Sequence, residues 1–178
     1  MIIVLNGVSS SGKSTLAKEI TKLRPDFFAF SIDDYDIVIE KMEDRANQRL
    51  ISVETEHFYY RNVAMFSDRG VHLILDQILH DPLIVQNFYE TLNGYPILLV
   101  GVHCPTEELA SREKARGNRQ IGQAIAQLSF VHQQEYYDVE VNTYTNSIME
   151  CAQNIVDRLE SDLPLTGFKK SMQACNFG

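Results

Sequence analysis

The stretch GVSSSGKS, residues 7–14, has the residue types and the spacing of a phosphate-binding loop. It fits the pattern G-x-x-x-x-G-K-[ST], in which two glycines let successive backbone N–H groups point into one concavity. Lys13 would reach the β- and γ-phosphates, and the hydroxyl of Ser14 could bind Mg²⁺. The N-terminus of the following helix would add partial positive charge. The candidate nucleotide-binding residues are Gly7, Val8, Ser9, Ser10, Ser11, Gly12, Lys13, Ser14 and Thr15.

An aspartate that could hold the metal follows in LILD, residues 73–76. Asp76 ends an apolar run typical of a buried strand, which suits a Walker-B-like carboxylate that binds Mg²⁺ through water. The alternative is an ordinary strand-end aspartate that caps a turn. The preceding phosphate loop favours the metal interpretation, with Ser14 and Asp76 as the metal ligands.

If the bound phosphate is transferred to a hydroxyl group, the site also needs a base for that hydroxyl, and SIDDYD, residues 31–36, supplies candidates. The first carboxylate past the predicted strand is Asp33, and ligands of open α/β sheets bind at the carboxyl ends of the strands. Asp33 is therefore the candidate catalytic base. Asp34 and Asp36 fit solvated helix-cap residues equally well.

Cations for the transferred phosphoryl group appear in SREKARGNRQIG, residues 111–122. Arg112, Arg116 and Arg119 recur at near-helical spacing, and Gly117 could act as a hinge for a lid that closes over the phosphates. The alternative is a solvated helix face that Glu107, Glu108 and Glu113 help to form. The needs of the site favour a role in catalysis and nucleotide binding for Arg116 and Arg119.

Apolar runs alternate with helical patterns along the chain. Strands are predicted at residues 2–6, 27–33, 71–76, 95–104 and 137–143. Helices are predicted after the phosphate loop, at about 83–92, after Pro105, at 123–133 and at about 147–159; residues 34–70 have an irregular helical character. This alternation predicts an α/β fold with a parallel sheet covered on both faces.

The length of 178 residues predicts one domain, with a core at about 1–159 and a loosely held tail at 160–178. The net charge of −8 argues against partners such as nucleic acid or a membrane surface. We find neither a basic-then-apolar leader nor a bilayer-spanning run, so a cytoplasmic location is expected. The spacing of Cys104, Cys151 and Cys175 indicates neither disulfides nor a zinc site.

The order of several segments resembles the chloramphenicol phosphotransferase-like family of small P-loop kinases. The segments are GVSSSGKS, FSID, LILD, LVGVHCP, REKARGNR and YDVEVNT, and the likeness runs from Met1 to about Leu159. It implies a three-layer P-loop NTPase fold like that of adenylate and shikimate kinases, with five parallel strands in the order 2-3-1-4-5. It also implies an ATP- and Mg²⁺-dependent transfer of phosphate to a small-molecule hydroxyl.

The resemblance gives each matching residue a role. It implies that Asp33 is the base for the acceptor hydroxyl, that Lys13 and Ser14 bind phosphate and Mg²⁺, and that Arg116 and Arg119 contact nucleotide phosphates. The chain departs from the antibiotic kinase itself at two places. Val8 replaces a glycine, and Gln77 replaces a second acid after the Walker-B-like aspartate; these departures bear on the identity of the acceptor.

The acceptor pocket is expected to form from residues 34–62. An aromatic pocket for a drug-like alcohol is one interpretation of Tyr35, Met42, Phe58, Tyr59 and Tyr60, and core packing at helical spacing is the other. His80, just past Asp76, is expected near the cleft. Two alternatives to a small-molecule kinase stay open, a nucleoside or nucleotide kinase and a non-catalytic ATP-binding regulator. The oligomeric state is not predicted.

Overall fold

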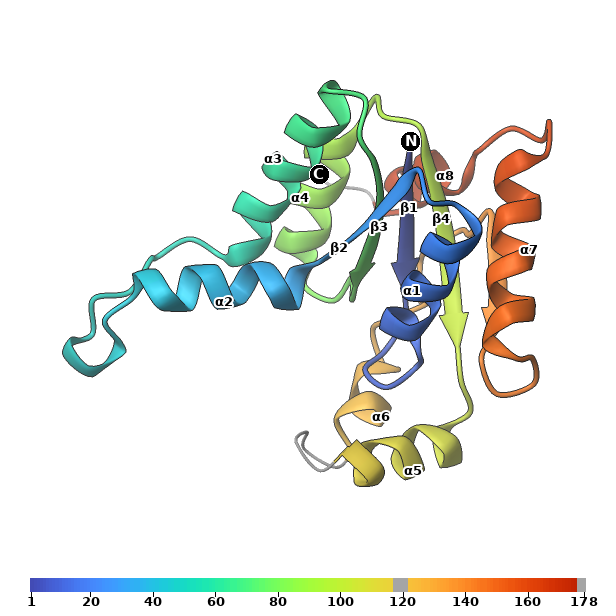
Figure 1. Ribbon diagram of the computed structural model, residues 1–178. Coiled ribbons are helices and arrows are strands. Elements are labelled where there is room, and N and C mark those ends of the chain that lie inside the picture. Colours follow the sequence, from blue (N-terminus) through green and yellow to red (C-terminus); the bar gives the residue numbers. More distant parts are fainter. Residues whose placement is uncertain (117–121, 176–178) are drawn as a thin grey trace.

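The computed structural model describes residues 1–116 and 122–175 of the chain (Figure 1). Five parallel strands form one sheet in the order β2-β3-β1-β4-β5, which confirms the predicted fold class. The strands are β1 (Ile2–Asn6), β2 (Phe27–Ser31), β3 (His72–Gln77), β4 (Ile97–His103) and β5 (Val139–Asn142). The central strand β1 is buried along its whole length, as its continuous apolar run predicts.

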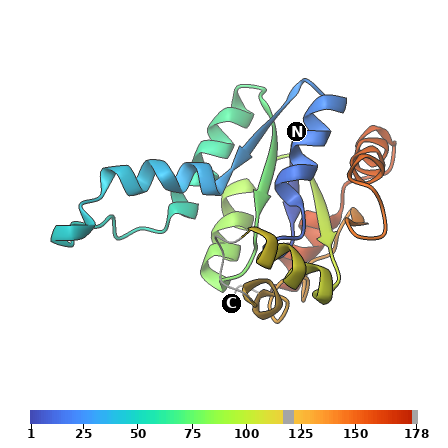
Figure 2. The same cartoon turned by 60° about the horizontal axis from the view of Figure 1, so that its bottom comes forward.

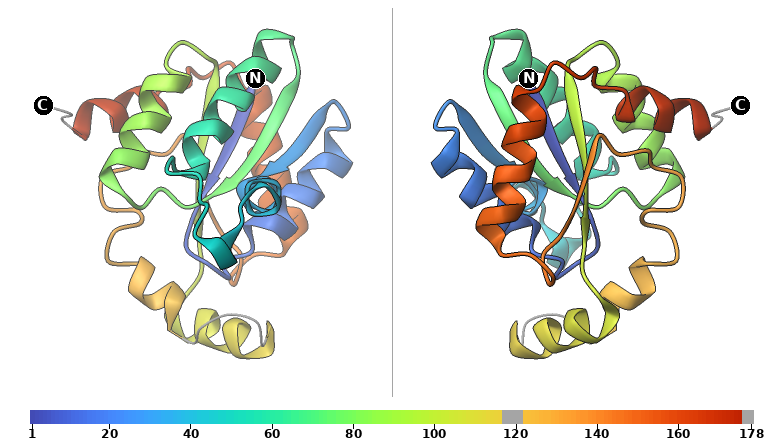
Figure 3. Two further views of the ribbon diagram at one scale, coloured as in Figure 1. Left: turned by 90° about the vertical axis from the view of Figure 1, so that its left-hand side faces the viewer. Right: turned by 90° about the vertical axis from the view of Figure 1, so that its right-hand side faces the viewer.

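Helices cover both faces of this sheet (Figure 3). On one face, α1 (Lys13–Leu23) and α7 (Ile148–Glu160) enclose a core that contains Ile3, Leu5 and Ile155. On the other face lie α3 (Thr55–Asp68), α4 (Pro82–Leu92) and α8 (Gly167–Ala174), whose core combines aliphatic side chains with aromatic ones such as Tyr59 and Phe88. Burial of these apolar side chains on both faces is the main force that holds the layers together.

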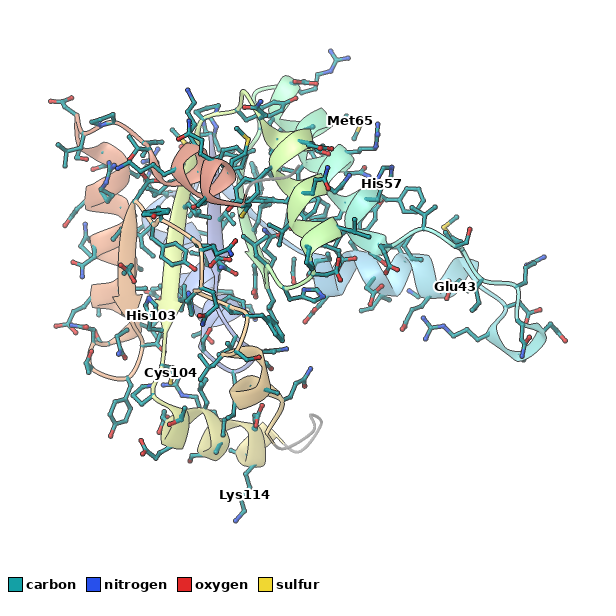
Figure 4. All side chains as sticks on the ribbon, turned by 180° about the vertical axis from the view of Figure 1, so that it is seen from behind. Glu43, His57, Met65, His103, Cys104 and Lys114 are labelled. Atoms are coloured by element: carbon teal, nitrogen blue, oxygen red, sulfur yellow. The ribbon has the colours of Figure 1, made fainter. Side chains whose placement is uncertain are left out.

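Two further groups of elements flank the carboxyl ends of the strands. Helices α5 (Thr106–Arg116) and α6 (Gln123–Gln127) lie beyond the ends of β1 and β4 (Figures 1 and 2) and pack on Val8 of the phosphate loop. On the other side, α2 (Ile32–Met42) and a 3₁₀ helix η1 (Arg45–Asn47) form an arm, residues 32–54, that projects from the sheet. Figure 4 labels Glu43 on this arm. The carboxyl edge of the sheet is therefore enclosed from two sides.

The predicted second strand is too long, because β2 ends at Ser31 and α2 begins at Ile32. Ser31 has the extended backbone of a residue that precedes a helix, and Asp33 and Asp34 occupy the first turn. Two carboxylates at that position are stabilised by the positive end of the helix dipole. The predicted helix at 123–133 is also too long: α6 ends at Gln127, and His132 has a left-handed φ of 68°.

The prediction of a loosely held tail is wrong for residues 167–174, which form α8. Phe168 packs against Phe88 and Tyr89 of α4, with ring centroids 5.4 and 4.9 Å apart. The carboxylate of Asp138 accepts hydrogen bonds from the N–H groups of Thr166 and Gly167 at 2.7 and 2.9 Å. One buried aromatic ring and one distant carboxylate thus fix a segment that has little periodicity of its own. Of the helices in the described ranges, none is long and apolar enough to span a bilayer.

Candidate active site

The phosphate loop turns sharply between β1 and α1. A Cβ atom on Gly7 would lie 2.5 Å from the carbonyl oxygen of Val102, so a side chain cannot fit there. Gly12 has a φ of 99°, in the left-handed region that favours glycine, and Ser10 has a φ of 62°. The two glycines of the motif are therefore required by close approach at one end of the loop and by backbone conformation at the other.

Lys13 and Ser14, at the end of this loop, both contact the carboxylate of Asp76. Lys13 is 7% exposed; its Nζ donates to the carbonyl oxygen of Val8 at 3.0 Å and lies 3.7 Å from Oδ1 of Asp76. The hydroxyl of Ser14 donates to Oδ2 of the same carboxylate. The structure thus brings together three predicted site residues from the N-terminus of α1 and the end of β3.

A cavity of about 290 Å³ opens at this point, and its lining fits a nucleotide phosphate chain. Its phosphate side is formed by Ser9, Ser10, Gly12, Lys13 and Ser14. Within the described part of the chain, the buried hydroxyl of Ser10 has no hydrogen-bond partner. Thr15 is exposed on α1 and does not line the cavity, although it was a candidate binding residue.

Oxygen donors for Mg²⁺ are present beside the phosphate side. Ser14 supplies a hydroxyl and Asp76 a carboxylate, which are hard ligands that suit this ion. Within residues 1–116 and 122–175, no group of three or more His, Cys, Asp or Glu side chains could hold a metal ion. That finding is compatible with Mg²⁺, which in kinase sites takes one or two protein ligands and completes its shell with phosphates and water.

The acceptor side of the cavity is formed by α2, α3 and the end of β3. Asp33 lines it from the first turn of α2, with Glu56 and Tyr60 from α3 and with Gln77 and His80. The structure therefore places Asp33 in the same cavity as Lys13 and Asp76, and His80 also lies there as expected.

The aromatic-pocket interpretation is wrong for four of its five residues. Tyr60 lines the cavity, but Tyr35, Met42, Phe58 and Tyr59 do not. Tyr59 is fully buried and donates its hydroxyl to the carbonyl oxygen of Phe30, and Met42 is 62% exposed on the arm. Burial and the carboxylate of Glu56 raise the pKa of Tyr60, so its hydroxyl stays protonated and can act as a donor.

Arg112 supports the phosphate loop through hydrogen bonds to Thr143, a role that the sequence did not indicate. Its guanidinium donates to the hydroxyl of Thr143 at 3.0 Å and to the carbonyl oxygen of Thr143 at 3.1 Å. The Thr143 hydroxyl in turn donates to the carbonyl oxygen of Ser11 at 2.6 Å. These contacts tie the loop to the segment after β5, so Arg112 is a structural residue.

The alternative interpretation of this helix placed Glu113 on a solvated face, and the structure shows that this is wrong. Glu113 is fully buried on α5, and its carboxylate accepts from the N–H groups of Gly122 at 2.8 Å and Ala124 at 2.6 Å. Gln127 of α6 then accepts from the N–H of Ser9 at 2.7 Å. A charged residue within a polar helix sequence gave no signal that it would cap the N-terminus of α6.

The predicted lid arginines cannot be placed at the site. Arg116 is the last residue of α5, but its side chain lies outside the described part of the chain, as does all of Arg119. Lys114, two residues before Arg116, points away from the protein (Figure 4). Glu113 and Gly122, on either side of the undescribed residues 117–121, are joined by a hydrogen bond from the N–H of Gly122.

The cysteines show no sign of reactivity. Burial raises the pKa of the thiols of Cys104, Cys151 and Cys175, so each is a weaker nucleophile than an exposed thiol. All three are free thiols.

Known proteins with a similar sequence are phosphotransferases and kinases by name. One relative, from Mycobacterium tuberculosis strain H37Rv, is named "Putative O-phosphotransferase Rv2636"; it is 25% identical, over 86% of this chain and 80% of its own length. A shikimate kinase from Clostridium botulinum is 30% identical, over 62% of this chain and 63% of its own length.

Solved structures share the fold at low identity. The tunicamycin resistance protein of Deinococcus radiodurans has a TM-score of 0.69 at 17% identity, over 92% of this chain and 97% of its own. The adenosine phosphosulfate (APS) kinase CysC of M. tuberculosis, solved with AMPPNP and APS, has a TM-score of 0.64 at 17% identity, over 90% and 97%. The family model described as "Chloramphenicol phosphotransferase-like protein" matches residues 1–160. With its phosphate loop, sheet order and nearly full-length match, the chain belongs to the chloramphenicol phosphotransferase-like family.

Proposed function

We propose that this protein transfers the γ-phosphoryl group of ATP to a hydroxyl group of a small molecule, as a chloramphenicol-like O-phosphotransferase. One observation carries the proposal: Asp33 lines the same cavity as Lys13, Ser14 and Asp76. A candidate base and a candidate phosphate site thus open into one space, which a transfer between two bound substrates requires.

The transfer assigns a role to each side of the cavity. The phosphate loop and Lys13 would hold the β- and γ-phosphates, and Ser14 and Asp76 would hold Mg²⁺, which supplies positive charge to the phosphates when bound. The acceptor oxygen forms a bond to the γ-phosphorus while the bond to the bridging oxygen of ADP breaks. The hydroxyl proton passes to the carboxylate of Asp33. Arg116 and Arg119 stay proposed as the cations that contact the phosphates.

The test follows phosphate onto chloramphenicol, by mass spectrometry, and release of ADP with a panel of other alcohols that includes nucleosides. We expect a product heavier by one phosphoryl group with at least one alcohol and a loss of about 100-fold or more in Asp33→Asn. ATP binding, measured by the thermal shift with Mg²⁺-ATP, should persist in Asp33→Asn and disappear in Lys13→Ala.

Two results would contradict the proposal. Undiminished transfer in Asp33→Asn would remove Asp33 as the base. ATP binding without ADP release for any alcohol would favour the non-catalytic regulator, and release with nucleosides or nucleotides only would favour the nucleoside or nucleotide kinase.

A further inference from the structure

Gln77 lines the acceptor side of the cavity and carries a buried amide. Gln77 is 3% exposed, and among the residues that the structure describes neither its Nε2 nor its Oε1 has a hydrogen-bond partner. Burial of such a group without a partner is costly, so a buried, unpaired amide on a residue that lines the cavity points to a ligand that pairs with it.

Strand geometry separates Gln77 from the phosphate side. Successive side chains of β3 point to opposite faces of the sheet. Ile74 belongs to the core beneath α1, and Asp76 shares its face and meets Ser14 of α1. Leu75 belongs to the core beneath α3 and α4, and Gln77 shares that face. Adjacent residues at the end of one strand thus serve the two halves of one cavity, Asp76 the phosphates and Gln77 the acceptor.

The acceptor side is also strongly acidic. Asp33 and Glu56 line the main cavity, and both also line an adjoining cavity of about 240 Å³ with Asp36 and Glu54. Among the described residues that line these two cavities, the cationic or titratable basic groups are Lys13, at the phosphate loop, and His80. A phosphorylated or carboxylated acceptor would therefore meet like charge where it has to bind.

Glu56 is the carboxylate best placed to bind a cation. It is half-buried, and burial raises its pKa. Within the described part of the chain it has no ion-pair partner, whereas Asp36 accepts a hydrogen bond from the hydroxyl of Thr55 at 2.7 Å. An ammonium group beside Glu56 would satisfy a carboxylate that its surroundings leave poorly solvated.

We propose that the acceptor is an alcohol that carries an ammonium group, that Glu56 binds the ammonium, and that the amide of Gln77 pairs with a neighbouring polar group of the same molecule. This inference rests on the proposed function for the transfer itself, but it concerns binding and can be tested by binding. A shikimate-like or nucleotide-like acceptor is disfavoured by the same carboxylates.

The test compares acceptors that differ in charge on a constant skeleton. One series is chloramphenicol, its deacylated amine and the N-succinyl derivative of that amine; the other is glucose, glucosamine and glucuronate. Affinity is measured by thermal shift and calorimetry on the full chain with Mg²⁺ and the unreactive analogue AMPPNP, and ADP release is measured with ATP. We expect the ammonium member to bind about tenfold more tightly than the neutral member in at least one series, and the carboxylate member to bind most weakly.

Variants assign the preference to residues. Glu56→Gln should abolish the preference for the ammonium member, while Glu90→Gln, which removes an exposed carboxylate on α4 outside both cavities, should retain it. Gln77→Met should weaken all members of the binding series about tenfold and leave the AMPPNP shift unchanged. If Glu56→Gln unfolds, Glu56→Asp tests the same contact, because the shorter side chain keeps the negative charge but moves it away from the ammonium group. The preference for the ammonium member should then decrease.

The inference is overturned if neutral or anionic members bind better, if no ammonium alcohol of either series binds, or if the preference survives in Glu56→Gln. The proposed function fails in a different way. In that case the ammonium alcohol binds in a Glu56-dependent manner but no ADP is released, or the wild-type protein shows no shift with AMPPNP.

Discussion

Ser14, in the first turn of α1, donates its hydroxyl to the carboxylate of Asp76 at the end of β3. This contact joins the phosphate loop to the neighbouring strand and places two oxygen ligands side by side. Because Mg²⁺ prefers oxygen ligands, we expect the pair to bind the metal jointly when the nucleotide is present.

Ser14→Ala should therefore weaken binding of Mg²⁺-ATP about tenfold, and the thermal shift caused by ATP should become nearly independent of Mg²⁺. Stability without nucleotide should change by less than about 1 kcal/mol, because the hydrogen bond is exposed. Thr21→Ala, on the same helix and away from the cavity, is the matched control. An unchanged Mg²⁺ dependence in Ser14→Ala would contradict the metal assignment.

Glu113 should stabilise the junction between α5 and α6. Its buried carboxylate accepts two backbone N–H groups at the start of α6, so Glu113→Ala leaves both without that partner. We expect a loss of about 2–3 kcal/mol in the free energy of unfolding, measured by denaturant titration. Hydrogen exchange at Ala124 should become faster.

Glu107→Ala is the control, since Glu107 is exposed on the same helix and should cost less than about 0.5 kcal/mol. Equal effects of the two substitutions would show that the Glu113 contacts contribute little. Glu113→Gln keeps one acceptor oxygen, so its cost should lie between the two.

Local patterns along the chain predicted the sheet and the phosphate loop. The continuous apolar run at residues 2–5 is typical of a strand buried on both faces of a parallel sheet. The glycines of the loop motif indicate the backbone conformation of the phosphate loop. Asp33 could be proposed for the site because strand ends converge on one edge, although it lies in a helix rather than at the end of a strand.

Contacts between residues distant in sequence could not be predicted. The position of α8 depends on Asp138 and on the ring of Phe168, and the phosphate loop is braced by Thr143, 132 residues after Ser11. Gln77 reads as an ordinary polar strand end until the structure shows that its amide is buried and unpaired. Such features depend on what surrounds a side chain, and sequence periodicity does not encode that.

His132 should make the protein less stable in acid. Burial lowers its pKa to about 4, and the neighbouring His103 and Lys13 act in the same direction. In the unfolded chain this histidine has an ordinary pKa of about 6.5. Between pH 6.5 and 4 the unfolded chain therefore binds a proton at His132 that the folded protein does not bind. The contribution is therefore fully present above pH 6.5 and is lost as the pH falls toward 4.

His132→Asn should flatten the stability profile between pH 6.5 and 4 by about 1 kcal/mol, a figure reduced because the ring is partly exposed. Asparagine is chosen because it tolerates the φ of 68° at this position. Unfolding curves at several pH values provide the measurement. A slope as steep in the variant as in the wild type would assign the acid sensitivity to other groups.

The buried, unpaired amide of Gln77 should lower the free energy of unfolding of the ligand-free protein. Because its amide is buried without a partner, Gln77→Met removes the unsatisfied polar atoms and keeps a similar side-chain length. We expect the free energy of unfolding of the ligand-free protein to rise by about 1 kcal/mol in denaturant titrations.

Gln127→Met is the matched control, because the Oε1 of Gln127 accepts from the N–H of Ser9 at 2.7 Å. Loss of that paired amide should destabilise the protein by about 1 kcal/mol, so the two identical substitutions should act in opposite directions. If Gln77→Met destabilised the protein as much as Gln127→Met does, Gln77 would have a structural partner and would not be held ready for a ligand. A gain in stability together with the loss of acceptor binding would instead be the behaviour of a binding residue whose polar group is kept for the substrate.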